Sequence, residues 1–256
     1  MRDVLRALAE GEITVAEAES RLAGYATTDA GRFDAARETR RGVPEAILGD
    51  GKPPGVVADL AAAALETTGR AIITRTTPEQ RDAIREAVET GDAPAGASIE
   101  VAAEAGTVVV HAPAFEPPSL AATVAVVTAG TSDAGPASEA AIIAGEMGAT
   151  VERIDDVGVA GIHRLFDHIE AIRAADVAVV AAGREGALPT VVAGLVDTPV
   201  IGLPVSVGYG HGGDGEAALL GMLQSCAALS VVNVDAGFVA GAQAGLIARA
   251  VDGAAG

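Results

Sequence analysis

The C-terminal half of the chain alternates short apolar runs with segments of helical periodicity. Val124–Val127, Val177–Ala182 and Val200–Leu203 are runs of small and branched residues with no polar position. A strand of this kind is buried on both faces of its sheet, so helices have to cover both sides. Because one helix separates each strand from the next, the crossovers are right-handed and the strands parallel. The pattern predicts an α/β fold: a three-layer α/β/α domain with a parallel sheet of flavodoxin-like or Rossmann-like order.

This domain is expected to span residues 119–256. Its strands are expected at residues 124–128, 150–154, 177–182, 200–203 and 231–234. Its helices are expected at residues 136–147, 162–174, 189–196, 216–228 and 237–251.

Residues 1–118 follow a less regular pattern and are expected to form a smaller α+β region. Residues 1–24 have the spacing of a helical hairpin, which is too short to be stable alone. Pro117 and Pro118 interrupt regular structure and mark the linker to the next domain. Gly91 is expected to end a helix. The helices and strands expected before the linker are 56–67, 71–74, 79–90, 98–100 and 107–112.

A polar, glycine-rich turn follows the first apolar strand of the C-terminal domain. Residues 129–135 separate that strand from a helix that Pro136 can begin, because proline suits the first helical position. Unpaired N–H groups and the helix dipole favour an anion at such a turn, and open α/β sheets bind ligands there. Ser132 and Asp133 are therefore either helix caps or ligand contacts, and cap preferences leave both roles open.

Four loops of this kind are expected to meet at the carboxyl edge of the sheet, at residues 129–135, 155–164, 183–189 and 204–216. Each loop is polar or rich in glycine, whereas the strand before it is apolar. One glycine-rich loop is a common packing device, but four that converge predict a ligand site.

Charged side chains in these loops are candidates for chemistry. His163 and Arg164 open a helix after a glycine-rich loop and could hold an anion, although a lone histidine is more often structural. Glu185 stands between Gly183 and Gly186, so its carboxylate is expected to project into the cleft. There it could act as a general base or hold a metal; capping the following helix is the alternative.

Cys226 is the single cysteine, which excludes an internal disulfide and a multi-cysteine metal cluster. A free cysteine is usually a small core residue, whereas a nucleophilic one needs partial exposure and a positive neighbourhood. Its polar neighbours leave both roles open. The longest loop carries Tyr209, His211 and Asp214, and its glycines fit a flexible solvent loop as well as a lid.

Composition narrows the class of partner. The 256 residues carry a formal net charge of −18, which argues against nucleic acid because phosphate backbones need a positive surface. Basic residues gather at Arg37, Arg40, Arg41 and Lys52. A solvated surface is the simpler interpretation of this cluster, and an anion or subunit contact is the functional one. With no export signal and no apolar run of ~18 residues, a cytoplasmic protein without a membrane segment is expected.

Five motifs, taken in order, resemble one known family. AGTSDAGPASEAA, DDVGVAGIHRL, AAGREGALPTVVAGLV, TPVIGLPVSVGYG and GEAALLGMLQSCA resemble the carboxylase of nickel-pincer nucleotide biosynthesis (LarB type) over nearly all of residues 121–251. Residues 34–52 resemble the N-terminal half of that family. The C-terminal domain is also similar, more distantly, to aminoimidazole ribonucleotide carboxylases and mutases (PurE-like). Glu185 and Cys226 depart from the purine pattern and fit the nickel-pincer family.

This resemblance implies a pyridinium-3,5-biscarboxylic acid mononucleotide synthase. Its substrate would be nicotinic acid adenine dinucleotide, carboxylated at C5 of the pyridinium ring with CO2 or bicarbonate and hydrolysed at the phosphoanhydride with release of AMP. Cys226 would be the nucleophile that adds to the ring, Glu185 would serve proton transfer or hydrolysis, and Mg2+ would neutralise the diphosphate. The resemblance also implies a homo-oligomer, with an octamer as one expectation, and pathway partners for sulfur and nickel insertion.

Two other functions stay open. A purine-type carboxylase or mutase acting on a ribonucleotide would not depend on Cys226. A non-catalytic nucleotide-binding assembly protein would bind adenylate in the glycine-rich loops and keep Cys226 in its core.

The candidate substrate-binding residues are Gly130, Thr131, Ser132, Asp133, Asp155, His163, Arg164, Gly183, Gly186, Ala187, Leu188, Pro204, Ser206 and Gly208.

Overall fold

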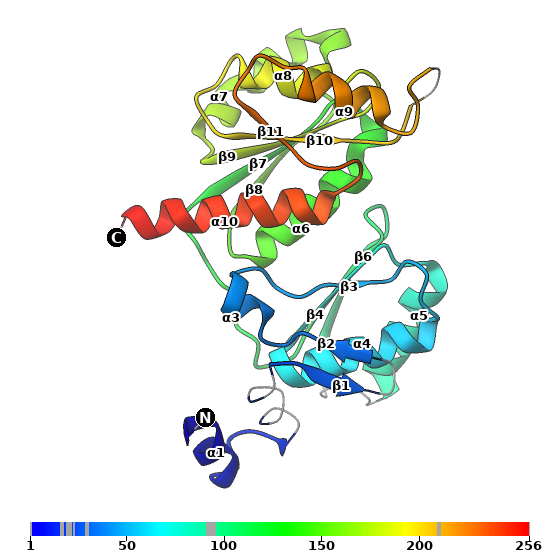
Figure 1. Cartoon of the computed structure of the whole chain (residues 1–256), viewed down its shortest axis with the longest axis vertical. Helices are drawn as coiled ribbons and strands as arrows, with labels where there is room; N and C mark the ends of the chain where they lie inside the picture. The colour runs from blue at the N-terminus through cyan, green and yellow to red at the C-terminus, as the bar shows by residue number, and fades with distance from the viewer. Residues whose placement is uncertain are drawn as a thin grey trace. The chain divides into compact units, whose positions relative to one another are not determined.

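Two units make up the chain, residues 1–116 and residues 117–256 (Figure 1). The computed structural model describes all residues except 1, 16, 17, 19–21, 23, 29, 30, 91–95, 209, 210 and 256. Within the described residues, none of the helices combines the length and the apolar character that a bilayer crossing requires.

The C-terminal unit contains a five-stranded parallel sheet in the order β8-β7-β9-β10-β11. The second strand of the unit thus lies at one edge, followed by the first, third, fourth and fifth. This is the flavodoxin-like order, with the topological switch between β7 and β9. The strands are β7 (Thr123–Thr128), β8 (Thr150–Ile154), β9 (Val177–Ala182), β10 (Val200–Pro204) and β11 (Leu229–Val231).

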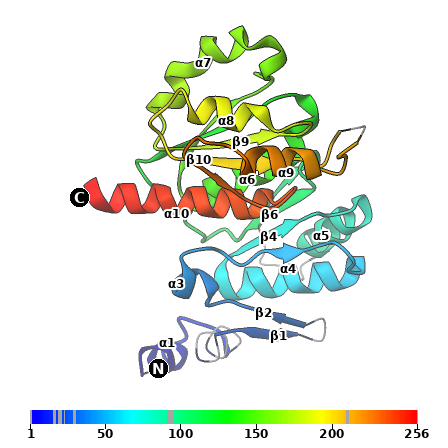
Figure 2. The same cartoon turned by 45° about the horizontal axis from the view of Figure 1, so that its top comes forward.

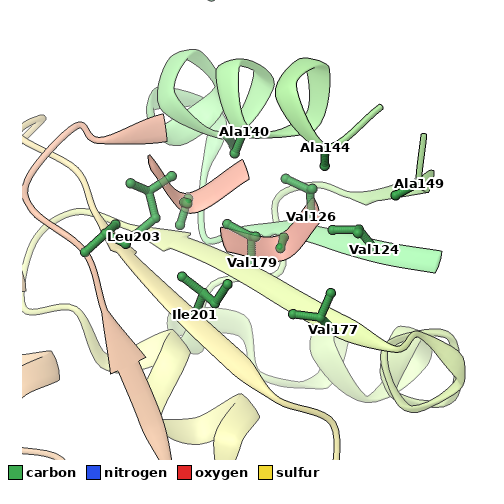
Figure 3. Packing of buried hydrophobic residues seen from close by; sticks show 14 of the residues in the cluster. Val124, Val126, Ala140, Ala144, Ala149, Val177, Val179, Ile201 and Leu203 are labelled. Carbon is green, nitrogen blue, oxygen red and sulfur yellow. The ribbon is translucent and has the colours of Figure 1, made fainter. Parts of the chain in front are cut away.

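Helices cover both faces of this sheet, as the wholly apolar strands require. Val124 and Val126 of β7 point into one core with α6 and α10, which lie side by side (Figure 2). Figure 3 shows the packing of this core. Ala125 and Val127 point to the opposite face, into a second core with α7, α8 and α9. The predicted three-layer α/β/α architecture is confirmed. The helices are α6 (Ala134–Glu146), α7 (His163–Ala174), α8 (Ala187–Ala193), α9 (Glu216–Leu223) and α10 (Gly237–Ala255).

Two predicted boundaries near Cys226 are wrong. The helix expected over residues 216–228 ends at Leu223, and β11 begins at Leu229 and not at residue 231. The Ser225 hydroxyl accepts a hydrogen bond from the Ala227 N–H at 3.1 Å. Such a local bond competes with the helical pattern, so the chain leaves the helix before Cys226.

The N-terminal unit is a mixed α+β structure with the sheet order β3-β4-β6-β5. Only the β3–β4 pair is parallel among these neighbours. A separate antiparallel pair, β1–β2, precedes the sheet. Much of the second helix expected within residues 1–24, and Gly91, lie outside the described residues. The elements are α1 (Arg2–Ala9), β1 (Ala26–Thr28), β2 (Gly31–Phe33), α3 (Arg37–Arg41), β3 (Ile47–Leu48), α4 (Pro54–Thr68), β4 (Arg70–Thr74), α5 (Pro78–Thr90), β5 (Ser98–Ala102) and β6 (Thr107–His111).

The basic cluster of this unit is largely engaged within the unit itself. Arg37 pairs with Glu45 at 3.1 Å, and Arg40 pairs with Asp34 at 2.6 Å. The Lys52 ammonium donates to a main-chain carbonyl oxygen of the same unit at 2.6 Å. These contacts favour the simpler interpretation, a surface whose charges are satisfied locally.

Candidate active site

A cleft of about 480 Å3 opens at the carboxyl edge of the parallel sheet. Its lining comes from the turn after β7, the loop before α7, the loop after β9 and the loop after β10. The cleft therefore lies at the topological switch, where α/β sheets of this order bind ligands. Nine of the candidate residues line it: Gly130, Ser132, Asp133, Arg164, Gly183, Glu185, Ala187, Leu188 and Gly208.

Asp133 holds two of these loops together. Its Oδ2 accepts a hydrogen bond from the Gly130 N–H at 2.8 Å, and its Oδ1 accepts one from the Gly183 N–H at 3.0 Å. The side chain is only 3% exposed. Burial raises the pKa of Asp133, and the N–H groups that donate to the carboxylate oppose that shift. Asp133 thus fixes the turn after β7 to the loop that carries Glu185.

The loop after β9 has an unusual backbone. Gly183 meets the carbonyl oxygen of Val207 so closely that a Cβ would collide with it. Arg184 and Gly186 both have positive φ, 58° and 67°, a region that glycine adopts readily and other residues rarely do. Glu185, between these two residues, is exposed and lines the cleft.

The cleft also has an apolar wall and a second cation that the sequence pattern did not identify. Val159, Ala160 and Val207 line it together with Arg184. Alanine and valine in a loop resemble packing residues, so only their position shows that they face a ligand cleft. Arg184 stands directly beside Glu185, and that adjacency was the available signal.

Several candidate residues have structural roles instead. Asp155 accepts a hydrogen bond from the Thr128 hydroxyl at 3.1 Å and pairs with Arg153 at 2.9 Å. The Ser206 N–H donates to Asp235 at 2.9 Å. None of the following candidates lines the cleft, as far as the described residues define it: Thr131, Asp155, His163, Gly186, Pro204 and Ser206.

Arg164 remains at the cleft and carries an ion pair. Its guanidinium lies 2.5 Å from the Asp156 carboxylate, both partly exposed. Asp156 has a positive φ of 59°, and this backbone conformation directs the chain between β8 and α7. The neighbouring His163 begins α7 and is exposed outside the cleft lining.

Cys226 is exposed and lies in the connection between α9 and β11. β11 begins where Leu229 pairs with Val200, the first residue of β10. This connection therefore returns the chain to the amino edge of the sheet, whereas the cleft lies at the carboxyl edge. Cys226 is not a core residue, and it does not line the cleft.

The residues of the cleft fit Mg2+ only as an ion brought by the substrate. Among the described residues, no group of three or more His, Cys, Asp and Glu side chains could hold a metal by itself. Mg2+ is commonly held by one or two carboxylates together with substrate phosphates. Glu185 is an exposed carboxylate of this cleft, whereas both oxygens of Asp133 are engaged by backbone N–H groups.

Comparison with known proteins agrees with this architecture. Residues 25–111 match the family model described as LarB/PurE-like N-terminal domain, and residues 123–255 match the one described as AIR carboxylase. The chain is 37% identical over 258 residues to the Methanocaldococcus jannaschii protein called "Uncharacterized protein MJ0165", and 97% of each chain is covered. The protein belongs to the LarB family, whose C-terminal domain is of the PurE-like carboxylase type.

Proposed function

We propose that the protein is the carboxylase and hydrolase that converts nicotinic acid adenine dinucleotide into pyridinium-3,5-biscarboxylic acid mononucleotide and AMP. The observation that carries the proposal is the cleft of a LarB-family chain in which one exposed carboxylate, Glu185, adjoins an apolar wall. The apolar wall suits a flat pyridinium ring, and the carboxylate can accept a proton.

The reaction needs a nucleophile because a cationic pyridinium ring is a poor carbon nucleophile. Addition of the Cys226 thiolate forms a C–S bond and converts the ring into an enamine-like dihydropyridine. C5 of that ring then attacks CO2 and forms the new C–C bond. Loss of the C5 proton and departure of the thiolate restore the aromatic ring. Water cleaves the phosphoanhydride, with Glu185 as the base for one of these proton transfers.

The position of Cys226 bears on whether one copy of the protein can form a complete active site. Because Cys226 does not line the cleft, we propose that its thiol acts on a ring bound beside Glu185 of a second copy. We therefore propose a homo-oligomer, with an octamer as one size, in which each complete site combines Cys226 of one copy with Glu185 of another. Closed symmetric assemblies repeat such a shared site at each equivalent interface.

Subunit mixing tests this arrangement. Cys226→Ser and Glu185→Gln chains carry different affinity tags, are co-expressed, and are purified through both tags. Each variant alone should be inactive, and the mixed assembly should regain a measurable part of the wild-type turnover. A mixed assembly as inactive as its parents contradicts a shared site. Asp167→Asn, at an exposed position on α7, serves as the matched control and should retain full activity in every mixture.

An aminoimidazole ribonucleotide carboxylase is the second candidate, because residues 123–255 match the AIR carboxylase model. Substrate comparison separates the two enzymes. Nicotinic acid adenine dinucleotide and aminoimidazole ribonucleotide are each incubated with the protein, bicarbonate and Mg2+. We expect a carboxylated product from the dinucleotide alone. Turnover of the ribonucleotide that survives Cys226→Ala would assign the protein to the purine reaction instead.

The proposal also assigns a cellular setting. An unpaired Cys226 thiol suits a reducing compartment, and we propose a cytoplasmic location. The product carries two ring carboxylates and lacks sulfur and nickel, so enzymes that insert these elements are the expected pathway partners.

A further inference from the structure

Helix α9 lies directly against the loop that carries Glu185. A Cβ added at Gly221 of α9 would collide with the main-chain carbonyl oxygen of Glu185. Across the same contact, a Cβ at Gly186 would lie 2.5 Å from the carbonyl oxygen of Ala218. Ala218 and Gly221 are three residues apart on the helix, so they face the loop from the same side. Two successive loop residues, Glu185 and Gly186, therefore rest on the bare backbone of one helix.

The glycine at position 221 is explained by this contact and not by the helix. Glycine weakens a helix interior relative to alanine, and Gly221 lacks the positive φ that would itself require glycine. It is also exposed to solvent, so the packing of the hydrophobic core does not demand a small residue there. What excludes a side chain at Gly221 is the close approach of α9 to the Glu185 carbonyl.

The loop itself decides where the Glu185 side chain leaves the backbone. Among the described residues, no hydrogen bond or ion pair fixes its carboxylate. One end of the loop is held at Gly183, whose N–H donates to Asp133 at 3.0 Å. The other end is held by α9, because Gly186 and the carbonyl of Glu185 pack on the helix. The two contacts together fix the main chain on either side of Glu185.

The buried side of α9 keeps the helix in place. Ala218 and Met222 belong to the core that α9 shares with the sheet, and a Cβ at Gly202 of β10 would lie 3.0 Å from the Met222 sulfur. A shift of α9 would disturb this packed core, whereas Glu185 is exposed and can move into solvent. A methyl group added at Gly221 is therefore expected to displace the Glu185 loop and not the helix.

We propose that Gly221 is a positioning residue: it holds the main chain of Glu185 and thereby sets where the Glu185 carboxylate stands in the cleft. This inference rests on the proposed function for the reaction in which Glu185 acts as a base. A displacement of about 1 Å at such a group can cost on the order of 10²-fold in rate. Gly221 itself does not line the cleft, so substrate binding should depend little on it.

Kinetics and hydrogen exchange together test this role. The wild type and Gly221→Ala are assayed with nicotinic acid adenine dinucleotide, bicarbonate and Mg2+. We expect kcat to fall tenfold or more and KM to stay unchanged. Exchange is followed at the Gly186 amide, whose N–H donates to the Gly183 carbonyl oxygen at 3.0 Å. This amide should be protected in the wild type and should exchange faster in Gly221→Ala.

Two controls separate this effect from lost stability and from a change at the thiol. Gly241→Ala also places a Cβ of a helical residue against a main-chain carbonyl oxygen, that of Ala140, away from the cleft. It should lower stability and leave kcat and the exchange of Gly186 unchanged. Cys226 follows α9 in the chain, so its alkylation by iodoacetamide is measured as well. The alkylation rate should be the same in Gly221→Ala and the wild type.

Four results would overturn the positioning role. The first two are unchanged kcat in an active Gly221→Ala enzyme, and free exchange of the Gly186 amide in the wild type itself. The third is an equal loss of kcat in Gly241→Ala. The fourth is altered Cys226 alkylation with unchanged Gly186 exchange, which would place the effect at the thiol. A wild type that does not turn over the dinucleotide, with faster Gly186 exchange in Gly221→Ala alone, supports the positioning and refutes the proposed function.

Discussion

Replacing Asp133 by asparagine should loosen the candidate active site. The two carboxylate oxygens of Asp133 each accept one N–H, from Gly130 at 2.8 Å and from Gly183 at 3.0 Å. Asparagine offers only one oxygen, so its NH2 group has to face one of the two donors. A buried donor left without an acceptor costs about 1–3 kcal/mol, which is the expected loss of unfolding free energy. Alanine removes both acceptors and should cost about 2–6 kcal/mol by the same reasoning.

Catalysis should suffer in parallel, because Gly183 precedes Glu185 in the same loop. A displacement of about 1 Å at a catalytic group can cost on the order of 10²-fold in rate. Hydrogen exchange and urea unfolding measure the two effects separately. Asp133→Asn should speed amide exchange at Gly130 or Gly183 and lower the urea midpoint, with Asp167→Asn as the exposed control. Unchanged exchange at both glycines would refute the view that Asp133 holds the two loops together.

Two further predictions concern packing and pH. Gly241→Ala should destabilise the protein by about 1–3 kcal/mol in thermal unfolding, because the new Cβ would collide with the backbone of Ala140. Gly253→Ala is the control, since a Cβ there meets open space on the same helix, and this variant should be neutral or slightly stabilising. Because the pKa of Asp133 is raised from 3.8, the stability from its protonation is full below pH 3.8 and is lost as pH rises through the folded-state pKa. Asp133→Asn should abolish that part of the pH dependence in urea titrations.

The fold class can be predicted from the sequence because a strand that is buried on both faces has apolar residues at successive positions. The central residues of β7 and all residues of β9 and β10 are apolar or small, and the structure buries nearly all of them. The hydrophobic pattern does not specify the order of the strands in the sheet. Flavodoxin-like and Rossmann-like sheets use the same apolar runs and crossovers, and only the placement of β8 at the edge beside β7 separates them.

The candidate site was predictable as a set of loops but not residue by residue. Asp155 and Ser132 are both polar residues in loops that follow strands, yet Asp155 accepts a hydrogen bond from the Thr128 hydroxyl of the neighbouring strand β7 while Ser132 lines the cleft. Such pairing depends on cross-strand neighbours that a single chain segment does not specify. The position of Arg184 at the cleft was not predicted for a different reason. Its left-handed backbone conformation is a property of the folded loop and has no signal in the sequence.

Cys226 shows how one local hydrogen bond changes a functional interpretation. The apolar spacing predicts a helix through residue 228, whereas α9 ends at Leu223 and the Ser225 hydroxyl accepts a hydrogen bond from the Ala227 N–H beyond it. The thiol is therefore exposed in a connecting segment and not packed in a core. This exposure suits a nucleophile.

The most direct test of the proposed reaction follows one carbon atom. Wild-type protein and Cys226→Ala are incubated with nicotinic acid adenine dinucleotide, 13C-bicarbonate and Mg2+, and the products are analysed by mass spectrometry. The wild type should give a mononucleotide that carries the labelled carboxylate, with one AMP released per product, and Cys226→Ala should give no labelled product. A wild-type reaction without label in the pyridinium product, or equal labelling by Cys226→Ala, would contradict the account.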